Sequence, residues 1–164
     1  MGSQNKIKLL IVDDEIDFLK AIAERLSLKG FDVITASNGR QAIASAEKDL
    51  FDVAVVDFQM PGMDGTQVLK ALKENHKHLE IIMLTGHATI DSAVESTKLG
   101  AFKYLEKPYS FDKLVEIIKE AYDARLKKKF EHNKKHMEEI NKLSLRESPL
   151  GILRALARLD DEEK

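Results

Sequence analysis

Carboxylate, hydroxyl and ammonium side chains stand at the ends of short apolar runs in this sequence. They are Asp13, Asp14, Asp57, Thr85 and Lys107. If the runs form neighbouring parallel strands, these side chains emerge at one edge of one sheet, where open α/β sheets bind ligands. Carboxylate oxygens suit hard divalent cations, and a hydroxyl with an ammonium group suits phosphoryl oxygens. The pattern therefore indicates a site for metal-dependent phosphoryl chemistry.

Taken one at a time, these residues have ordinary structural explanations. An Asp pair after a strand is most often a turn followed by a helix N-cap. Asp57 precedes a loop rich in Pro and Gly, and Thr85 alone fits a strand-end hydroxyl. Lys107 alone fits a surface lysine at a turn, and its bond to Pro108 can be cis at a cost of only ~0.5–1 kcal/mol. These explanations do not account for all of the residues falling at the carboxyl ends of predicted strands.

The elements that would position these residues are short apolar runs alternating with amphipathic helical patterns. Predicted strands cover residues 8–12, 32–36, 52–56, 80–84 and 102–105, and predicted helices cover 14–29, 40–48, 66–74, 90–99 and a segment beginning at 111. Such alternation implies parallel strands with right-handed crossovers. Residues 53–56 are all apolar, as in a sheet covered on both faces. We therefore expect an α/β fold with a doubly wound, five-stranded parallel sheet and five helices.

The last predicted helix does not stop where such a domain should end. No Gly or Pro interrupts the sequence between Phe111 and Pro149, which predicts a helix continuing to about residue 145. A short amphipathic helix then covers 149–159, before an acidic end. We therefore expect a domain at 6–124 and a helical C-terminal extension at 125–164. Phe130, Met137 and Ile140 have the spacing of a short coiled-coil seam, but they make fewer than three heptads.

The composition is ordinary for a globular protein, with 164 residues, 43% hydrophobic, 33% charged and no cysteine. The missing cysteine excludes disulfides, zinc–thiolate sites and thiol nucleophiles. No apolar stretch approaches the ~20 residues of a membrane span, and the first residues lack the apolar core of a secretory signal. We therefore expect a cytoplasmic protein with no membrane partner.

Charge is unevenly distributed along the chain. Residues 1–124 carry 20 acidic and 15 basic residues, whereas 125–164 carry 8 acidic and 11 basic ones. An acidic body makes a nucleic-acid partner unexpected. The basic stretch at 125–136 can contact phosphates or acidic partners, although a charge run is usually a solvated helix face. His132 and His136, four residues apart, raise the same choice between a metal-binding pair and a solvated face.

The order and spacing of the polar residues resemble the response-regulator receiver domain of bacterial two-component signalling. The resemblance covers about residues 6–124 and rests on Asp13-Asp14, Asp57, the loop MPGMDG at 60–65, Thr85 and Lys107-Pro108. Residues 85–108 look most like receivers of the nitrogen-regulator class of transcriptional activators. The resemblance implies a flavodoxin-like sheet with strand order 2-1-3-4-5. It does not explain residues 125–164.

The resemblance also implies separate roles for the site residues. Asp57 would be the phospho-acceptor, with Lys107 and Thr85 holding phosphoryl oxygens. The cofactor would be Mg²⁺ or Mn²⁺. It would be bound by Asp14, Asp57 and the backbone carbonyl of Gln59, with Asp13 acting through water. The family favours that division, but the sequence leaves open which of the two adjacent aspartates binds the metal directly.

A conformational switch is the second implication of the resemblance. Tyr104 stands three residues before Lys107, where the family places a switch aromatic that moves with Thr85. The residues two positions after Asp57 and Thr85 are Gln59 and His87, which would tune the lifetime of the phosphoryl group. Tyr104 alone also fits an ordinary strand aromatic.

The expected function is that of a phosphorylation-dependent switch rather than an enzyme. Its partners would be a sensor histidine kinase or a histidine phosphotransfer protein, an unknown output protein, and a second copy through residues 90–124 or the C-terminal helix. One alternative is an N-terminal fragment, or a divergent form, of a DNA-binding transcriptional regulator. Another is a metal-dependent phosphatase with an aspartyl nucleophile, but such enzymes typically carry a second Asp where this chain has Gln59.

Overall fold

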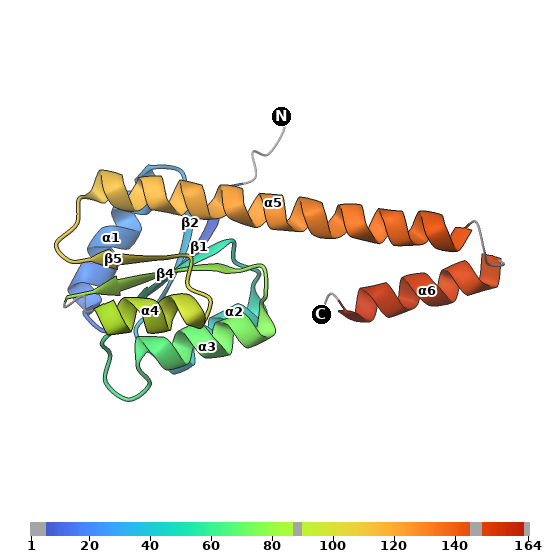
Figure 1. Ribbon diagram of the computed structural model, residues 1–164. Coiled ribbons are helices and arrows are strands. Elements are labelled where there is room, and N and C mark those ends of the chain that lie inside the picture. The colour runs from blue at the N-terminus through green and yellow to red at the C-terminus, as the bar shows by residue number, and fades with distance from the viewer. Residues whose placement is uncertain (1–5, 87–89, 145–148, 163–164) are drawn as a thin grey trace. The chain divides into compact units, whose positions relative to one another are not determined.

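The computed structural model describes residues 6–86, 90–144 and 149–162 of the chain. The chain divides into two compact units, Met1–Arg125 and Leu126–Lys164. The first unit contains the whole sheet, and the second contains the distal part of one long helix together with a final helix (Figure 1).

The sheet has five parallel strands in the order β2-β1-β3-β4-β5, which confirms the expected topology. The strands are β1 (Lys8–Val12), β2 (Asp32–Ala36), β3 (Val53–Asp57), β4 (Glu80–Thr85) and β5 (Lys103–Glu106). Asp57 and Thr85 are the last residues of their strands, one residue further than the apolar runs predicted. The ladder continues through them because Asp57 pairs with Leu84 and Thr85 pairs with Glu106.

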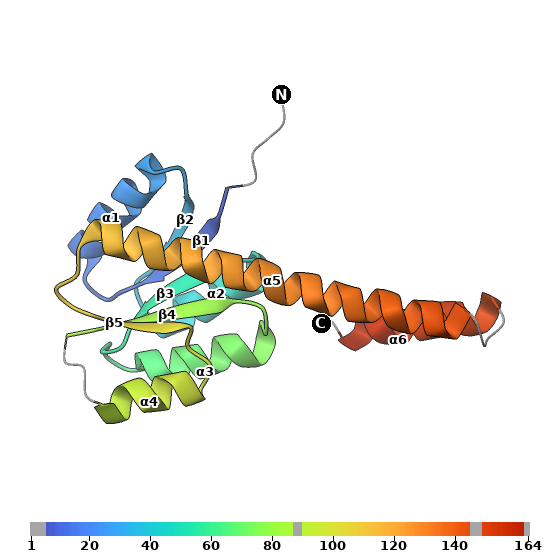
Figure 2. The same ribbon diagram turned by 45° about the horizontal axis from the view of Figure 1, so that its top comes forward.

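Helices cover both faces of the sheet (Figures 1 and 2). Those of the first unit are α1 (Ile16–Leu28), α2 (Gly39–Lys48), α3 (Gly65–Asn75), α4 (Ile90–Lys98) and the first part of α5 (Phe111–Ser144), whereas the rest of α5 and α6 (Pro149–Glu162) belong to the second unit. Successive strand residues point to opposite faces, so β1 sends Leu9 and Ile11 into one core and Leu10 and Val12 into the other. The first core is packed by α1 and α5, and the second by α2 and α3. The doubly covered sheet therefore explains why its strands are apolar without alternation.

Local signals define where several helices begin. The Asp64 side chain accepts a hydrogen bond from the backbone N–H of Gln67, whose side chain accepts one from the backbone N–H of Asp64. This reciprocal pair is a capping box that starts α3 directly after the β3–α3 loop. Ser110 caps α5 by accepting a hydrogen bond from the backbone N–H of Lys113 at 3.1 Å.

The middle of α5 is held to the amino edge of the sheet by a charged network around Arg125. Arg125 Nε lies 3.0 Å from Asp52 Oδ1, and Arg125 Nη1 donates to the His78 carbonyl at 2.8 Å. The other Asp52 oxygen accepts a hydrogen bond from the backbone N–H of Lys8. These contacts fasten α5 to the sheet at the last residue of the first unit.

Gly65 allows α3 to begin against the end of β3. A Cβ atom at this position would lie 2.5 Å from the Asp57 carbonyl oxygen and 2.7 Å from Phe58 Cα. We expect Gly65→Ala to destabilise the fold by about 2 kcal/mol, because the obstructing atoms are backbone and cannot move aside cheaply. Urea unfolding monitored by circular dichroism measures the change. Gly86→Ala is the matched control, since its Cβ would meet no atom within 4 Å. Equal unfolding midpoints for the two variants would contradict the prediction.

No helix within the described residues is both long enough and apolar enough to span a bilayer.

Candidate functional site

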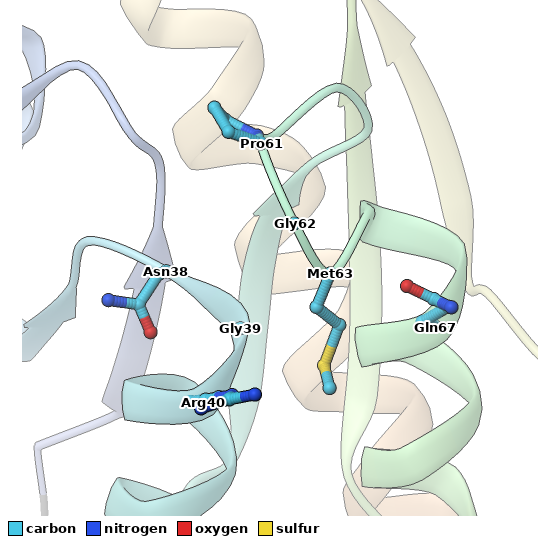
Figure 3. Close-up of a pocket in the computed structure, with 7 residues that line it drawn as sticks. All are labelled: Asn38, Gly39, Arg40, Pro61, Gly62, Met63 and Gln67. Atoms are coloured by element: carbon cyan, nitrogen blue, oxygen red, sulfur yellow. The ribbon is translucent and has the colours of Figure 1, made fainter.

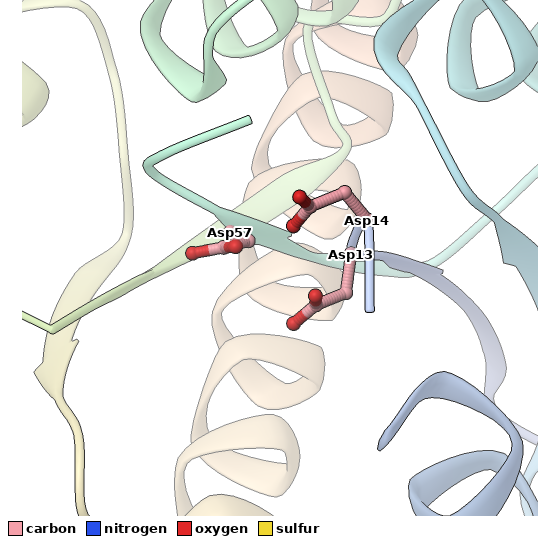
Figure 4. Close-up of side chains that lie close together, drawn as sticks. All are labelled: Asp13, Asp14 and Asp57. Atoms are coloured by element: carbon pink, nitrogen blue, oxygen red, sulfur yellow. The ribbon is translucent and has the colours of Figure 1, made fainter. Parts of the chain in front are cut away.

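Three carboxylates converge at the carboxyl edge of the sheet, where β1 and β3 end (Figure 4). One oxygen from each of Asp13, Asp14 and Asp57 lies within 4.8 Å of the others. Among the described residues this is the one group of three or more His, Asp or Glu side chains close enough to share a metal ion. The structure thus brings together the carboxylates that the sequence places at the ends of separate runs.

The two adjacent aspartates differ in exposure. Asp13 is 1% exposed, and its Oδ1 atom accepts a hydrogen bond from the backbone N–H of Glu15 at 2.9 Å. Its Oδ2 atom lies 3.5 Å from the Lys107 ammonium. Asp14 is exposed. Asp13 is therefore committed to protein contacts on both oxygens, whereas Asp14 presents its carboxylate toward solvent.

Asp57 lies in an environment that disfavours its charged form. Its pKa is raised above the ordinary value, mainly because burial removes water from the carboxylate. The Lys107 ammonium and a hydrogen bond from the Gln59 backbone N–H act in the opposite direction, whereas the negative charges of Asp13 and Asp14 raise the pKa further. A cation bound between the three carboxylates would relieve this cost, so the site is suited to a divalent metal.

Lys107 brings a positive charge to the same edge from the end of β5. Its Nζ atom lies 3.5 Å from Asp13 Oδ2 and 3.6 Å from Asp57 Oδ1. Its backbone N–H donates to the Thr85 carbonyl at 2.6 Å, and its bond to Pro108 is cis. The ammonium also lies 5.3 Å from the centre of the Phe18 ring, which contributes a cation–π contact. The side chain is thus held toward the carboxylates while remaining 29% exposed.

The predicted switch residues lie on neighbouring strands. Thr85 is fully buried at the end of β4, and Tyr104 in β5 is half-buried, paired in register with Met83. The Tyr104 ring meets the Phe58 ring edge-on, with 6.4 Å between centroids. Phe58 directly follows Asp57 in the sequence, so one aromatic contact connects the end of β3 to Tyr104.

Of the two residues predicted to tune phosphoryl lifetime, the structure describes Gln59. The Gln59 side chain is exposed beside the carboxylate cluster. His87 lies outside the described residues.

Tyr109 is a site residue that the sequence patterns did not single out. Its hydroxyl oxygen is buried, and its pKa is raised to about 12 by burial first and then by the charges of Asp13 and Asp57. It lines a cavity of about 320 Å³ with Lys107, Phe18 and neighbouring residues of α1 and α5. In the sequence, the position of Tyr109 two residues after Lys107 was the available indication that it lies near the site.

A second pocket, of about 470 Å³, lies between the start of α2 and the β3–α3 loop (Figure 3). It is lined by Asn38, Gly39, Arg40, Pro61, Gly62, Met63 and Gln67. Gly39 lets the two segments approach, because a Cβ there would lie 2.8 Å from Met63 Sδ in the loop. None of the carboxylates in the cluster contributes to this pocket.

The raised pKa of Asp57 leads to a prediction about stability in the absence of metal. An acid whose pKa is higher in the folded state destabilises the fold as pH rises through that pKa, because the unfolded chain ionises more easily. We expect Asp57→Asn to stabilise the metal-free protein at pH 7, by on the order of 1 kcal/mol. The gain should shrink as the pH falls toward the ordinary Asp pKa of 3.8. Urea unfolding in a chelator at several pH values measures it, and a less stable Asn variant at pH 7 would refute this prediction.

Comparison with known families gives a match over most of the chain. Residues 9–119 match the family described as the response regulator receiver domain. The C4-dicarboxylate transport transcriptional regulatory protein DctD of Pseudomonas aeruginosa is 35% identical, over 72% of this chain and 26% of its own length. The DNA-binding transcriptional regulator NtrC of Salmonella typhimurium is 35% identical, over 68% of this chain and 24% of its own. The chain thus spans about a quarter of these curated relatives.

Solved structures show the same fold as a separate unit. A CheY-like response regulator receiver domain protein from Methanospirillum hungatei superposes with a TM-score of 0.73 and is 31% identical. The similarity covers 76% of this chain and 99% of that one. The residues that match the family, 9–119, lie within the first unit.

Proposed function

Because this chain belongs to the response regulator receiver domain family, we propose that Asp57 accepts a phosphoryl group and thereby switches a protein-binding surface. The donor is a sensor histidine kinase or a histidine phosphotransfer protein. The observation that carries the proposal is the position of the Lys107 ammonium, within 3.6 Å of both Asp13 and Asp57 in a cluster of three carboxylates. A nucleophile, a cation for phosphoryl oxygens and a set of metal ligands are thus combined in one place.

The cluster fits Mg²⁺, or Mn²⁺ in its place, because these ions prefer oxygen ligands. Asp14 and Asp57 are the proposed direct ligands, with the Gln59 carbonyl, and Asp13 acts through water. The contacts of Asp13 support this division, since both of its oxygens already face protein donors. When bound, the metal neutralises carboxylate charge and attracts phosphoryl oxygens.

The proposed chemistry is a single displacement at phosphorus. An ionised Asp57 oxygen forms a bond to phosphorus as the bond to the donor imidazole nitrogen breaks, and that nitrogen keeps the electron pair. Lys107 and Thr85 hold the phosphoryl oxygens. Loss of the group to water returns Asp57 to its starting state, with Gln59 and His87 controlling access of that water. The protein performs no other turnover.

The proposed switch runs through Thr85 and Tyr104. The Thr85 hydroxyl moves toward the phosphoryl group, and Tyr104 takes the space that it leaves, so the populations of two surface states shift. The edge-on contact of Tyr104 with Phe58 supports this route. Because Phe58 follows Asp57, a movement at the end of β3 changes the packing around the Tyr104 ring. The surface formed by residues 90–124 then changes its affinity for an output protein or a second copy.

Relatives named as transcriptional regulators keep a DNA-linked role open for this chain as part of a longer regulator. Binding of the chain to a DNA duplex, with an affinity that falls steeply as salt increases, would distinguish that alternative from output by protein contact. Output by protein contact, in the cytoplasm, is the function we propose for this chain.

The test is phosphoryl uptake by the purified full chain. We expect acetyl phosphate with Mg²⁺ to add one phosphoryl group, detected by intact mass, and a chelator to prevent it. Peptide mapping after borohydride reduction should locate the modified residue at Asp57. Uptake that does not depend on a divalent metal, or that maps to another residue, would overturn the proposal.

A further inference from the structure

Three large apolar side chains lie exposed along one face of α5 within the second unit. Leu126 is 46% exposed, Phe130 71% and Met137 57%. Because an α-helix advances about 100° per residue, spacings of four and seven place these side chains on one narrow face about 17 Å long. We call this face the 126–137 stripe. Exposed large apolar side chains that are gathered in this way mark an interaction surface more often than singly scattered ones do.

The second unit does not cover this face itself. Its other helix, α6, belongs to the same unit, yet Phe130 and Met137 keep more than half of their surface exposed. The half-buried residues of this part of α5 lie on an adjacent face and include His132 and His136, whose ring centroids are 4.3 Å apart.

Lysines flank the stripe on both sides. On a helical projection Lys127 and Lys134 lie along one edge, and Lys129 lies along the other. All three are exposed, and none of them forms an ion pair within the described part of the chain. The nearest acidic residues of this segment, Glu131 and Glu138, are further round the helix. The stripe therefore presents apolar surface with lysines on both sides, two along one edge and one along the other.

These charges disfavour a second copy as the occupant of the stripe. In a parallel pair Lys129 of one copy would face Lys134 of the other, and in an antiparallel pair like edges would meet. The width of the stripe argues against a lipid bilayer, because an interfacial helix buries a broad apolar face, whereas this face is narrow and includes Asn133. A narrow seam with charged edges is the geometry of helix-to-helix pairing.

We propose that the 126–137 stripe is a docking seam for an amphipathic helix of a partner protein, with apolar residues at heptad spacing and Asp or Glu along both edges. The apolar side chains supply the contact area, and the lysines select acidic edges and reject basic ones. The seam lies on the extension that the receiver family does not account for. Its occupation does not require phosphoryl transfer, so this inference goes beyond the proposed function.

The test uses two synthetic helical peptides of equal length as probes, both with Leu at positions a and d of three heptads. One carries Glu at positions e and g, and the other carries Lys there. We expect the full chain to bind the Glu peptide at least tenfold more tightly than the Lys peptide, by fluorescence anisotropy, with affinity falling as salt increases. Phe130→Ser should abolish binding while leaving phosphoryl uptake unchanged.

A charge-reversal variant gives a more specific test of the role of the lysines. The variant Lys127→Glu/Lys129→Glu/Lys134→Glu should bind the Lys peptide more tightly than the Glu peptide, because acidic edges on the stripe attract lysines and repel glutamates. The matched control Lys135→Glu/Lys142→Glu changes exposed lysines on the opposite face and should keep the wild-type preference. Equal binding of both peptides, or none, would overturn the proposal. It would also be overturned by self-association, or by binding to phosphatidylserine vesicles, that Phe130→Ser removes.

Discussion

Asp57→Asn is expected to take up no phosphoryl group from acetyl phosphate, with Mg²⁺ present, under conditions that label the wild type fully. The amide nearly preserves the shape of the carboxylate but supplies neither a negative charge nor a nucleophilic oxygen. Asp57 ends β3, and its Oδ1 atom lies 3.6 Å from the Lys107 ammonium, so a phosphoryl group on Asp57 would meet that ammonium. Intact mass spectrometry measures the loss, and beryllofluoride should likewise leave the variant's tyrosine fluorescence unchanged.

The matched control is Asp49→Asn. Asp49 is an exposed aspartate beyond the other edge of the sheet, where it pairs with Lys8 at 3.0 Å. An exposed pair of this kind contributes little to stability, so this variant should be phosphorylated like the wild type. Continued labelling of Asp57→Asn at the wild-type rate would remove Asp57 as the acceptor and, with it, the proposed function.

Lys107→Ala is expected to slow phosphoryl uptake by about 100-fold or more, the loss typical when a preorganised charge on the developing transition state is removed. The Lys107 ammonium lies 3.5 Å from Asp13 and 3.6 Å from Asp57, so it is the protein's own cation at the reacting edge. Binding of Mg²⁺ should persist, because the proposed ligands are retained, and can be measured by titration of intrinsic fluorescence. Separate readouts for metal and phosphoryl group thus distinguish a role in transfer from a role in metal binding.

Lys103→Ala is the control on the same strand. Lys103 forms a 2.8 Å ion pair with Glu120, but both side chains are more than 40% exposed. Its removal should leave uptake unchanged, since the pair is screened by solvent and lies outside the carboxylate cluster. If Lys107→Ala took up the phosphoryl group as fast as Lys103→Ala, the assigned role of Lys107 would be wrong.

The architecture was largely readable from local patterns. Residues 53–56 are apolar without alternation because both faces of β3 are covered, and that run alone predicted a buried parallel strand. Asp57 and Thr85 were placed one residue beyond their strands, whereas they complete them. The reason is that a polar residue ends an apolar run, but its backbone can still pair with the neighbouring strand.

The roles of individual site residues were less readable. The sequence predicted that Asp13, Asp14 and Asp57 would gather, but not that Asp13 is buried while Asp14 is exposed. In the sequence, Tyr109 looks like an ordinary residue after Pro108, although its hydroxyl is buried near the carboxylates in the structure. Burial of this kind depends on how α1 and α5 close over the edge of the sheet, and no local pattern encodes it.

By itself, the sequence determined which chemical groups reach the carboxyl edge of the sheet, because the alternation of strand and helix and the positions of turns are local properties. Only the tertiary structure decided how those groups act on one another. The pKa of Asp57 is raised by burial and by the carboxylates of Asp13 and Asp14, which follow another strand, and the Lys107 ammonium lies within 3.6 Å of both Asp13 and Asp57. Distances between side chains that are far apart in sequence are set by strand register and core packing. The same holds for the 126–137 stripe, whose spacing is visible in the sequence but whose exposure is a property of the folded chain.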